Sequence, residues 1–230
     1  MKFISYAQNF EDVMLWRALK HISEGFYIDI GAQHPTIDSV SKAFYDVGWH
    51  GVHVEPSPVY AELLRKEREN DLIIQAAISD HCGMIDFFEV KDTGLSTGIE
   101  QYANQHINEM KWDVKKSIIP CVTLDAILEK VKPKEIHWLK IDVEGMEDLV
   151  FKGWNLEYKP WVVVVEATKP NSQELSIEWE ELILLKNYKY VYFDGLNRFY
   201  LSNNHLELEN FFSYPPCVFD NFTKNCPDFE

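Results

Sequence analysis

Acidic side chains recur where short apolar runs of this sequence end. Asp29, Glu55, Asp142, Glu144 and Glu166 each end or closely follow one such run. Carboxylates in these positions can accept hydrogen bonds from ribose hydroxyls, bind a cation or take up a proton. Because the carboxyl ends of parallel strands meet at one edge of a sheet, we expect these side chains to gather along a single rim.

Glu55 has two interpretations. An acid at the end of the second strand of a nucleotide-binding sheet can accept two hydrogen bonds from a ribose 2′,3′-diol, and it would repel a 2′-phosphate. Alternatively, its carboxylate caps the helix that we expect to begin near Ser57. The acid that follows the first strand, Asp29, favours ribose binding.

The first turn, residues 29–35, contains one glycine, Gly31, and lacks the G-x-G-x-x-G pattern of dinucleotide-binding proteins. A pyrophosphate needs close backbone approach and several N–H donors from a helix end, and this turn offers fewer of both. An adenosine ligand that carries a positive charge and no phosphate suits acidic strand ends better. S-adenosylmethionine is such a ligand, because it joins a ribose and an amino acid through a sulfonium.

Transfer of a methyl group to an alcohol requires removal of the hydroxyl proton. Asp142, Glu144 and Glu166 end neighbouring strands and can converge, so one of them could act as a base, or together they could hold a divalent cation such as Mg²⁺. Glu144 could instead cap the following helix. We favour a base or a substrate contact, since no His–acid spacing demands a metal. His34 is a fourth catalytic candidate, because histidine titrates near neutral pH.

The elements that must position these side chains alternate between strand and helix. This order predicts an α/β fold with a mostly parallel, doubly wound sheet and right-handed crossovers. Residues 72–78 form a third apolar run, and residues 91–118 read as an irregular insertion with some helix. A hairpin over residues 190–201 closes the sheet. We expect one domain over 1–230, with an N-terminal cap segment (1–24) and an irregular C-terminal tail (202–230).

Composition narrows the function classes. The chain has 230 residues, of which 46% are hydrophobic and 26% charged, with a net charge of −15. These values are typical of a folded globular protein, and the acidity argues against nucleic acid and anionic membranes as partners. We find neither a signal peptide nor an apolar run long enough to span a membrane, so we expect a cytoplasmic protein. A Cys217–Cys226 bridge and the oligomeric state are left open.

Six segments, taken in order, resemble the FkbM family of S-adenosylmethionine-dependent methyltransferases. The resemblance extends over about residues 3–201. The segments are residues 5–12, 26–32, 48–56, 76–80, 122–125 and 139–145.

The resemblance implies a Rossmann-like class I methyltransferase fold and transfer of a methyl group to a hydroxyl of a sugar, a glycan or a related metabolite. It implies that Asp29 and Gly31 line the methionine part of the cofactor, that Glu55 holds the ribose, and that Ile78 and its neighbours flank the adenine. Asp142 would lie beside the sulfonium, and Gln8 and Glu11 would close over the site. The adjoining Ala32, Pro56 and Ser79 are expected to contact the cofactor as well.

Two other functions share part of this pattern. A nucleotide-dependent oxidoreductase would use Glu55 in the same way, although the single glycine of the first turn argues against it. A non-catalytic protein of the same fold would bind S-adenosylmethionine without transferring its methyl group.

Overall fold

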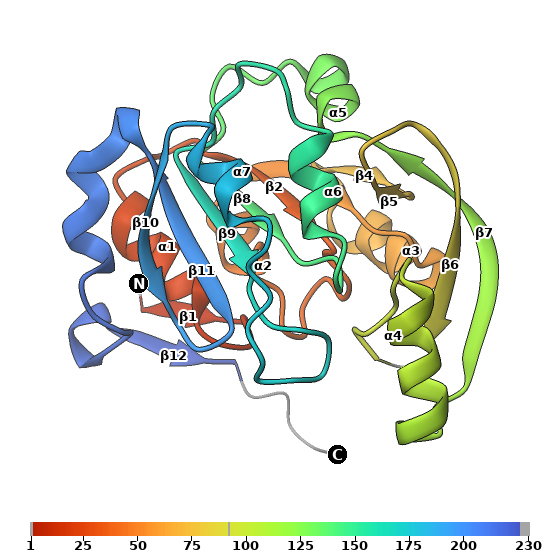
Figure 1. The fold of residues 1–230 in the computed structure, drawn as a ribbon. Helices are drawn as coiled ribbons and strands as arrows, with labels where there is room; N and C mark the ends of the chain where they lie inside the picture. Colours follow the sequence, from red (N-terminus) through yellow and green to blue (C-terminus); the bar gives the residue numbers. More distant parts are fainter. Residues whose placement is uncertain (1, 92, 226–230) are drawn as a thin grey trace.

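A seven-stranded sheet forms the centre of the molecule. In the computed structural model, which describes residues 2–91 and 93–225, the strand order is β10-β11-β9-β8-β2-β3-β4 (Figure 1). The five strands from β9 to β4 are parallel, whereas β11 runs antiparallel to both β9 and β10. The α/β class and the mixed sheet therefore agree with the expectation. The strands are β2 (Phe26–Ile30), β3 (His50–Val54), β4 (Leu72–Ile74), β8 (Trp138–Ile141), β9 (Val162–Glu166), β10 (Tyr188–Phe193) and β11 (Asn197–Ser202).

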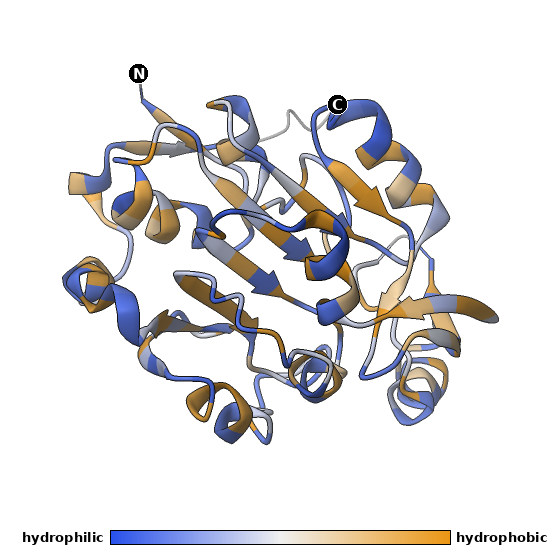
Figure 2. Cartoon of the chain, turned by 90° about the horizontal axis from the view of Figure 1, so that it is seen from above, coloured by the Kyte–Doolittle hydropathy of each residue, from blue (hydrophilic) through white to orange (hydrophobic). Residues whose placement is uncertain are grey.

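Both faces of this sheet are covered by helices. Alternate strand residues point to opposite faces, so Ile28 and Leu139 belong to one apolar core while Tyr27 and Trp138 belong to the other. The hydrophobic residues lie along the strands and on the helix sides that face them (Figure 2). The first core is closed by α5 (Leu124–Val131), α6 (Glu147–Lys152) and α7 (Glu180–Leu184), and the second by α1 (Glu11–Leu19) and α2 (Lys42–Asp46).

A smaller sheet lies at the opposite end of the molecule from β10 and β11 (Figure 1). Its order is β5-β7-β6, with β5 (Ala77–Ile78), β6 (Gly83–Val90) and β7 (Val114–Val122). The apolar run at residues 72–78 is therefore divided between two sheets. α3 (Pro58–Glu67) precedes β4, which is the last strand of the main sheet.

The insertion between β6 and β7 is more regular than residues 91–118 suggested. It contains α4 (Glu100–Gln105) and a π-helical turn, η1 (His106–Met110), before β7 begins. The expectation of an irregular segment was wrong for residues 114–118. The sequence does not reveal β7, because most of its side chains are partly or fully exposed and show no apolar pattern. The strand forms because eight of its residues pair with residues of β6.

The first and last described strands of the chain pair with each other. β1 (Phe3–Ser5) pairs in parallel with β12 (Phe222–Lys224), and the Arg17 side chain donates hydrogen bonds of 2.6 Å to both carboxylate oxygens of Asp220. The segment after residue 202 holds two 3₁₀ helices, η2 (Asn203–Phe212) and η3 (Val218–Asp220). Buried Leu208 and Phe212 of η2 join the core over α1.

Among the described residues, no helix is both long enough and apolar enough to cross a membrane. Cys226 lies outside the described residues. The open question of a Cys217–Cys226 bridge therefore lies outside them as well.

Candidate active site

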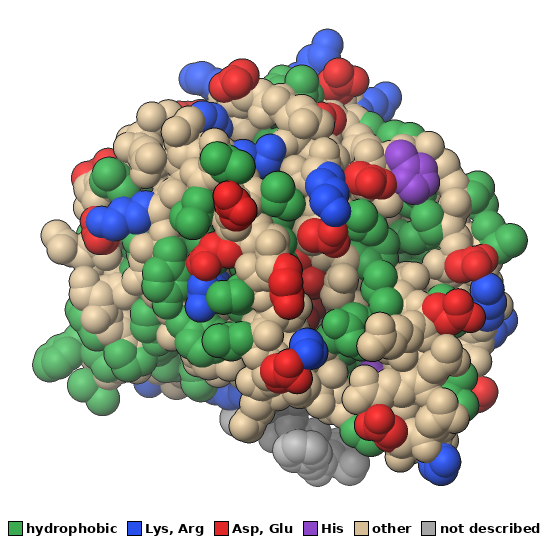
Figure 3. Space-filling view, in the orientation of Figure 1, with side chains coloured by type: hydrophobic (Ala, Val, Ile, Leu, Met, Phe, Trp, Pro, Cys, Tyr) green, Lys and Arg blue, Asp and Glu red, His purple; other side chains and the backbone are tan. Residues whose placement is uncertain are grey.

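The carboxyl ends of the parallel strands open into a cavity of about 630 Å³, a volume in the range of small-molecule sites. Its described lining contains seven acidic side chains and one lysine, Lys140. Acidic side chains also lie near the middle of the outer face drawn in Figure 3. The acids that line the cavity are Glu11, Asp29, Asp38, Glu55, Asp142, Glu144 and Glu166.

All but one of the residues expected at the site line this cavity. The exception is Ser79, which follows Ile78 and whose backbone N–H donates to the Val122 carbonyl in the smaller sheet. The role expected for Ser79 is therefore not supported by its position, although it stays a prediction. The expected residues that do line the cavity are Gln8, Asp29, Gly31, Ala32, His34, Glu55, Pro56, Ile78, Asp142, Glu144 and Glu166.

Gly31 makes the turn after β2 possible. Its φ is +78°, and a Cβ at this position would lie 1.7 Å from the carbonyl oxygen of Asp142. Only glycine combines this left-handed conformation with such close backbone approach. The turn therefore brings the ends of β2 and β8 together, which places Asp29 and Asp142 at the same rim.

Glu55 both caps the local backbone and faces the cavity. One carboxylate oxygen accepts the Ser57 N–H at 2.7 Å, and the other accepts the Gln33 N–H at 2.8 Å. Burial raises the pKa of Glu55 to about 7, even though these two N–H donors favour the charged form. The two interpretations of Glu55 are compatible, because a carboxylate has about four acceptor positions and the backbone uses two.

Lys140 compensates part of the acidic rim. Its Nζ lies 2.6 Å from an Asp142 carboxylate oxygen. Burial by itself would lower the pKa of Lys140, but Asp142, Asp29 and Glu11 outweigh burial and raise it. Lys140 is therefore protonated, and it neutralises one acid of the rim.

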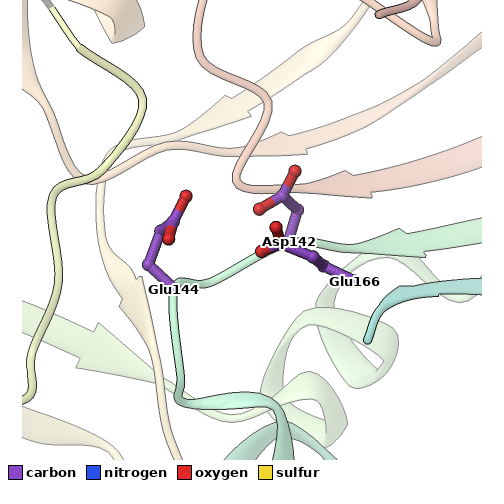
Figure 4. Close-up of side chains that lie close together, drawn as sticks. All are labelled: Asp142, Glu144 and Glu166. Atoms are coloured by element: carbon purple, nitrogen blue, oxygen red, sulfur yellow. The ribbon is translucent and has the colours of Figure 1, made fainter. Parts of the chain in front are cut away.

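Asp142, Glu144 and Glu166 form the carboxylate cluster. They come from the turn after β8 and from the end of β9, and one oxygen of each lies within 4.8 Å of the others. Figure 4 shows Asp142 and Glu166 close together, with Glu144 facing them across the turn. The structure thus brings together the three strand-end acids that the sequence expected to converge.

The turn that carries Glu144 is built from two left-handed residues. Glu144 has a φ of +52° and Gly145 a φ of +97°. The hydroxyl of buried Thr97 donates to the Glu144 carbonyl at 2.8 Å, so the insertion before β7 holds this turn. The Glu144 carboxylate is left free of hydrogen bonds to the turn itself and is available to the cavity.

The two glutamates of the cluster have raised pKa values. Burial raises the pKa of Glu144 well above its usual value, and the nearby Asp142 raises it further. Burial and then Asp142 also raise the pKa of Glu166 well above its usual value. Shifted carboxyl groups in a cavity are typical of binding and catalytic sites.

The N-terminal segment closes one side of the cavity. One Glu11 oxygen accepts the Asn9 N–H at 2.9 Å, and the other accepts the side-chain amide of Asn197 at 2.9 Å. Burial raises the pKa of Glu11 to about 7. Gln8 also lines the cavity.

His34 lines the cavity but already uses one ring nitrogen. Its Nδ1 accepts the backbone N–H groups of Thr36 and Ile37, both at 3.0 Å. The neutral ring must then carry its proton on Nε2 and act as a donor there. Burial lowers the pKa of His34, which favours this neutral form. This arrangement supports a positioning contact better than proton uptake.

Sequence reasoning missed a buried network behind Asp29. The Asp71 carboxylate accepts hydrogen bonds from the Tyr27 hydroxyl at 2.7 Å and the Gly51 N–H at 2.7 Å. His53 lies between two acids, with Nε2 2.9 Å from Asp71 and Nδ1 3.8 Å from Asp29. The signal was His53 in the buried part of β3, next to Asp29 in register.

A second missed residue is Glu147, at the start of α6. One of its oxygens accepts the Gly145 N–H at 3.2 Å, and burial raises the pKa of Glu147 to about 7. An acid in the first turn of a helix was a usable signal for a residue that supports the turn.

A comparison with protein families now adds to this geometry. The family model described as "Methyltransferase FkbM domain" matches residues 29–192, well over half of the chain. The chain belongs to the FkbM methyltransferase family. No curated protein sequence matches the chain closely enough to count as a relative.

The FkbM span contains the main part of the cavity. It begins at Asp29 and includes Glu55 and the carboxylate cluster, whereas Gln8 and Glu11 precede it. This FkbM protein therefore carries its strand-end acids in the part shared with the family.

Proposed function

We propose that this protein is an S-adenosylmethionine-dependent O-methyltransferase that acts on a hydroxyl of a sugar, a glycan or a related small metabolite. We also infer that its main sheet is that of the class I, Rossmann-like methyltransferase fold. The observation that carries the proposal is the acidic cavity at the carboxyl edge of the sheet, in a chain of a methyltransferase family.

The charge and the volume of the cavity support S-adenosylmethionine as the ligand. Seven acids against one lysine favour a cationic ligand and disfavour a phosphate-bearing one. Glu55 keeps free acceptor positions for a ribose diol, and the lining near it includes apolar Ala77, Ile78 and Phe87, which suit an adenine ring. The turn at Gly31 brings Asp29 to the part of the cavity where the amino-acid tail would lie.

When bound, S-adenosylmethionine supplies a methyl group on a positively charged sulfur. The protein's own task is to place the acceptor oxygen in line with that methyl group and to remove the hydroxyl proton. Glu144 and Glu166 are proposed to contact the acceptor hydroxyl and draw off its proton, because one buried oxygen of each, Oε2, lacks a protein partner among the described residues. Asp142, paired with Lys140, fixes the charge beside them.

The acceptor side of the cavity is polar and mostly uncharged. Ser96, Thr168, Asn171 and Ser172 line it from the insertion before β7 and from the loop after β9. Hydroxyl and amide groups of this kind are suited to an acceptor that is rich in hydroxyls. We infer that the acceptor enters between these two loops.

Calorimetry with S-adenosylhomocysteine tests the cofactor assignment. We expect one binding event per chain and no heat with NADH, and the reverse result would contradict the proposal. A double cycle with Glu55→Ala and the 2′-deoxy analogue of the ligand tests the ribose contact. Each change alone should weaken binding by about 1–3 kcal/mol, and the two should not add if Glu55 contacts the diol.

A further inference from the structure

The carboxylate cluster contains buried oxygens without protein partners. Glu144 is 7% exposed, and its Oε2 has no hydrogen-bond partner among the described residues. The same is true of Oε2 of Glu166. A buried acceptor without a partner is costly, so a water, an ion or a ligand group is expected to satisfy it. Both side chains belong to a group whose oxygens face one another (Figure 4).

Nearby basic side chains do not supply the missing charge. Lys140 pairs with Asp142 and leaves Glu144 and Glu166 uncompensated. Lys169, in the loop after β9, pairs with Glu174, and Arg198 on β11 pairs with Glu180. The cluster thus holds three carboxyl groups against one ammonium group, and a cation that replaces their protons would give the free oxygens a partner.

We propose that Asp142, Glu144 and Glu166 hold one hard divalent metal cation of the Mg²⁺, Mn²⁺ or Ca²⁺ class. All three ligand atoms are carboxylate oxygens, which these ions prefer, while zinc and copper sites use nitrogen or sulfur. Two oxygens on opposite sides of one ion lie about 4.2 Å apart for Mg²⁺ and about 4.8 Å apart for Ca²⁺. The spacing within 4.8 Å therefore suits one ion without rearrangement of the strands.

The cation also narrows the acceptor class, and this step rests on the proposed function. Three protein oxygens leave coordination positions open toward the cavity. Hard cations bind oxygen in preference to sulfur or amine nitrogen, and they lower the pKa of a bound hydroxyl. The site therefore favours an alcohol as acceptor over a thiol or an amine.

Manganese binding tests the site without any turnover. Mn²⁺ is titrated into the EDTA-treated full chain, without S-adenosylmethionine or acceptor, and the free ion is followed by electron paramagnetic resonance. We expect one Mn²⁺ per chain, displaced by excess Mg²⁺ or Ca²⁺. Absence of binding at millimolar Mn²⁺, or binding that neither ion displaces, would overturn the proposal.

Variants locate the bound ion. Glu144→Gln and Glu166→Gln should each weaken Mn²⁺ binding by at least about tenfold. Glu55→Gln is the matched control, because Glu55 lines the same cavity but its oxygens already accept hydrogen bonds from backbone N–H groups. This change should alter the Mn²⁺ affinity by less than about threefold. An equal loss of Mn²⁺ affinity in all three variants would contradict the assignment of the ion to the carboxylate cluster. Circular dichroism verifies folding, and Glu166→Asp replaces any variant that does not fold.

The cation and the cofactor are separated by titrating S-adenosylhomocysteine into the same samples. If S-adenosylhomocysteine binds and Mn²⁺ does not, the cation inference fails and the proposed function stands. If Mn²⁺ binds and S-adenosylhomocysteine does not, the proposed function fails and only the metal site remains.

Discussion

Two groups of buried acids in this protein differ in how their oxygens are used. The Asp71 side chain is fully buried and accepts hydrogen bonds from Tyr27, Gly51 and His53. Glu144 is also buried and Glu166 partly so, yet each has a buried oxygen, Oε2, without a partner among the described residues. The acid in the first group ties β2 and β3 to the chain after α3, whereas the acids in the second face a cavity. Burial of a carboxylate does not by itself indicate function; what distinguishes Glu144 and Glu166 is an oxygen without a partner in a residue that lines the cavity.

The largest expected effect is on methyl transfer. Glu144→Gln or Glu166→Gln should lower kcat by about 10²- to 10⁴-fold, because each change removes a group that acts on the acceptor proton. The free energy of unfolding should stay about the same, since the Oε2 atom that each change replaces makes no protein hydrogen bond among the described residues. Transfer of a labelled methyl group to an acceptor found by screening hydroxylated glycans, together with urea unfolding, measures both. If Glu144→Gln and Glu166→Gln instead unfold more easily but still transfer methyl groups, these two acids do not differ in role from Asp71.

The converse result is expected for Asp71. Asp71→Asn should lower the free energy of unfolding by about 3 kcal/mol, because it leaves buried donors without a charged acceptor. Binding of S-adenosylhomocysteine to the folded variant should change by less than about threefold, or roughly 0.7 kcal/mol. The control is Asp148→Asn, which breaks an exposed ion pair with Lys152. It should lower the free energy of unfolding by less than about 1 kcal/mol. A stable Asp71→Asn variant that no longer binds would instead place Asp71 in the site.

A third prediction concerns pH. Burial raises the pKa of Glu11, Glu55 and Glu147 from 4.5 to about 7. The folded chain therefore binds these protons more tightly than the unfolded chain, and the resulting stability is present below pH 4.5 and lost as the pH rises through 7. Without ligand and in EDTA, the free energy of unfolding should be higher at pH 6 than at pH 8 by about 1.4 kcal/mol for each group, or roughly 4 kcal/mol for the three.

Urea unfolding at a series of pH values measures this slope. Glu55→Gln should reduce it, while a control at exposed Glu129 (Glu129→Gln) should not. A free energy of unfolding that rises between pH 6 and pH 8 would show that these acids are ionised, and hence partnered, in the free protein.

The smallest effect is expected at His34. Because its Nδ1 accepts two backbone N–H groups, the ring has no free acceptor for a proton in its neutral form. His34→Gln should therefore reduce methyl transfer by less than about tenfold, or about 1.4 kcal/mol. A loss as large as that of Glu144→Gln would return His34 to the role of base.

Much of the site could be predicted from the sequence because it follows from the order of the elements. Once residues 26–30 and 138–141 are parallel neighbours, the acids after them must meet at one edge, and Asp29, Glu55, Asp142 and Glu166 do line one cavity. The division of residues 72–78 between two sheets could not be predicted, because an apolar run is the same in either sheet. The Asp71 network also escaped prediction, since no local pattern links a loop aspartate to a strand histidine 18 residues earlier.

A crystal structure with S-adenosylhomocysteine tests the central claim most directly, namely that the acidic cavity at the carboxyl edge of the sheet is the methyl-transfer site. The account predicts the ribose hydroxyls within hydrogen-bonding distance of Glu55 and the ligand sulfur facing Asp142, Glu144 and Glu166. A ligand bound elsewhere, or one with its ribose turned away from Glu55 and its sulfur away from these three acids, would contradict it.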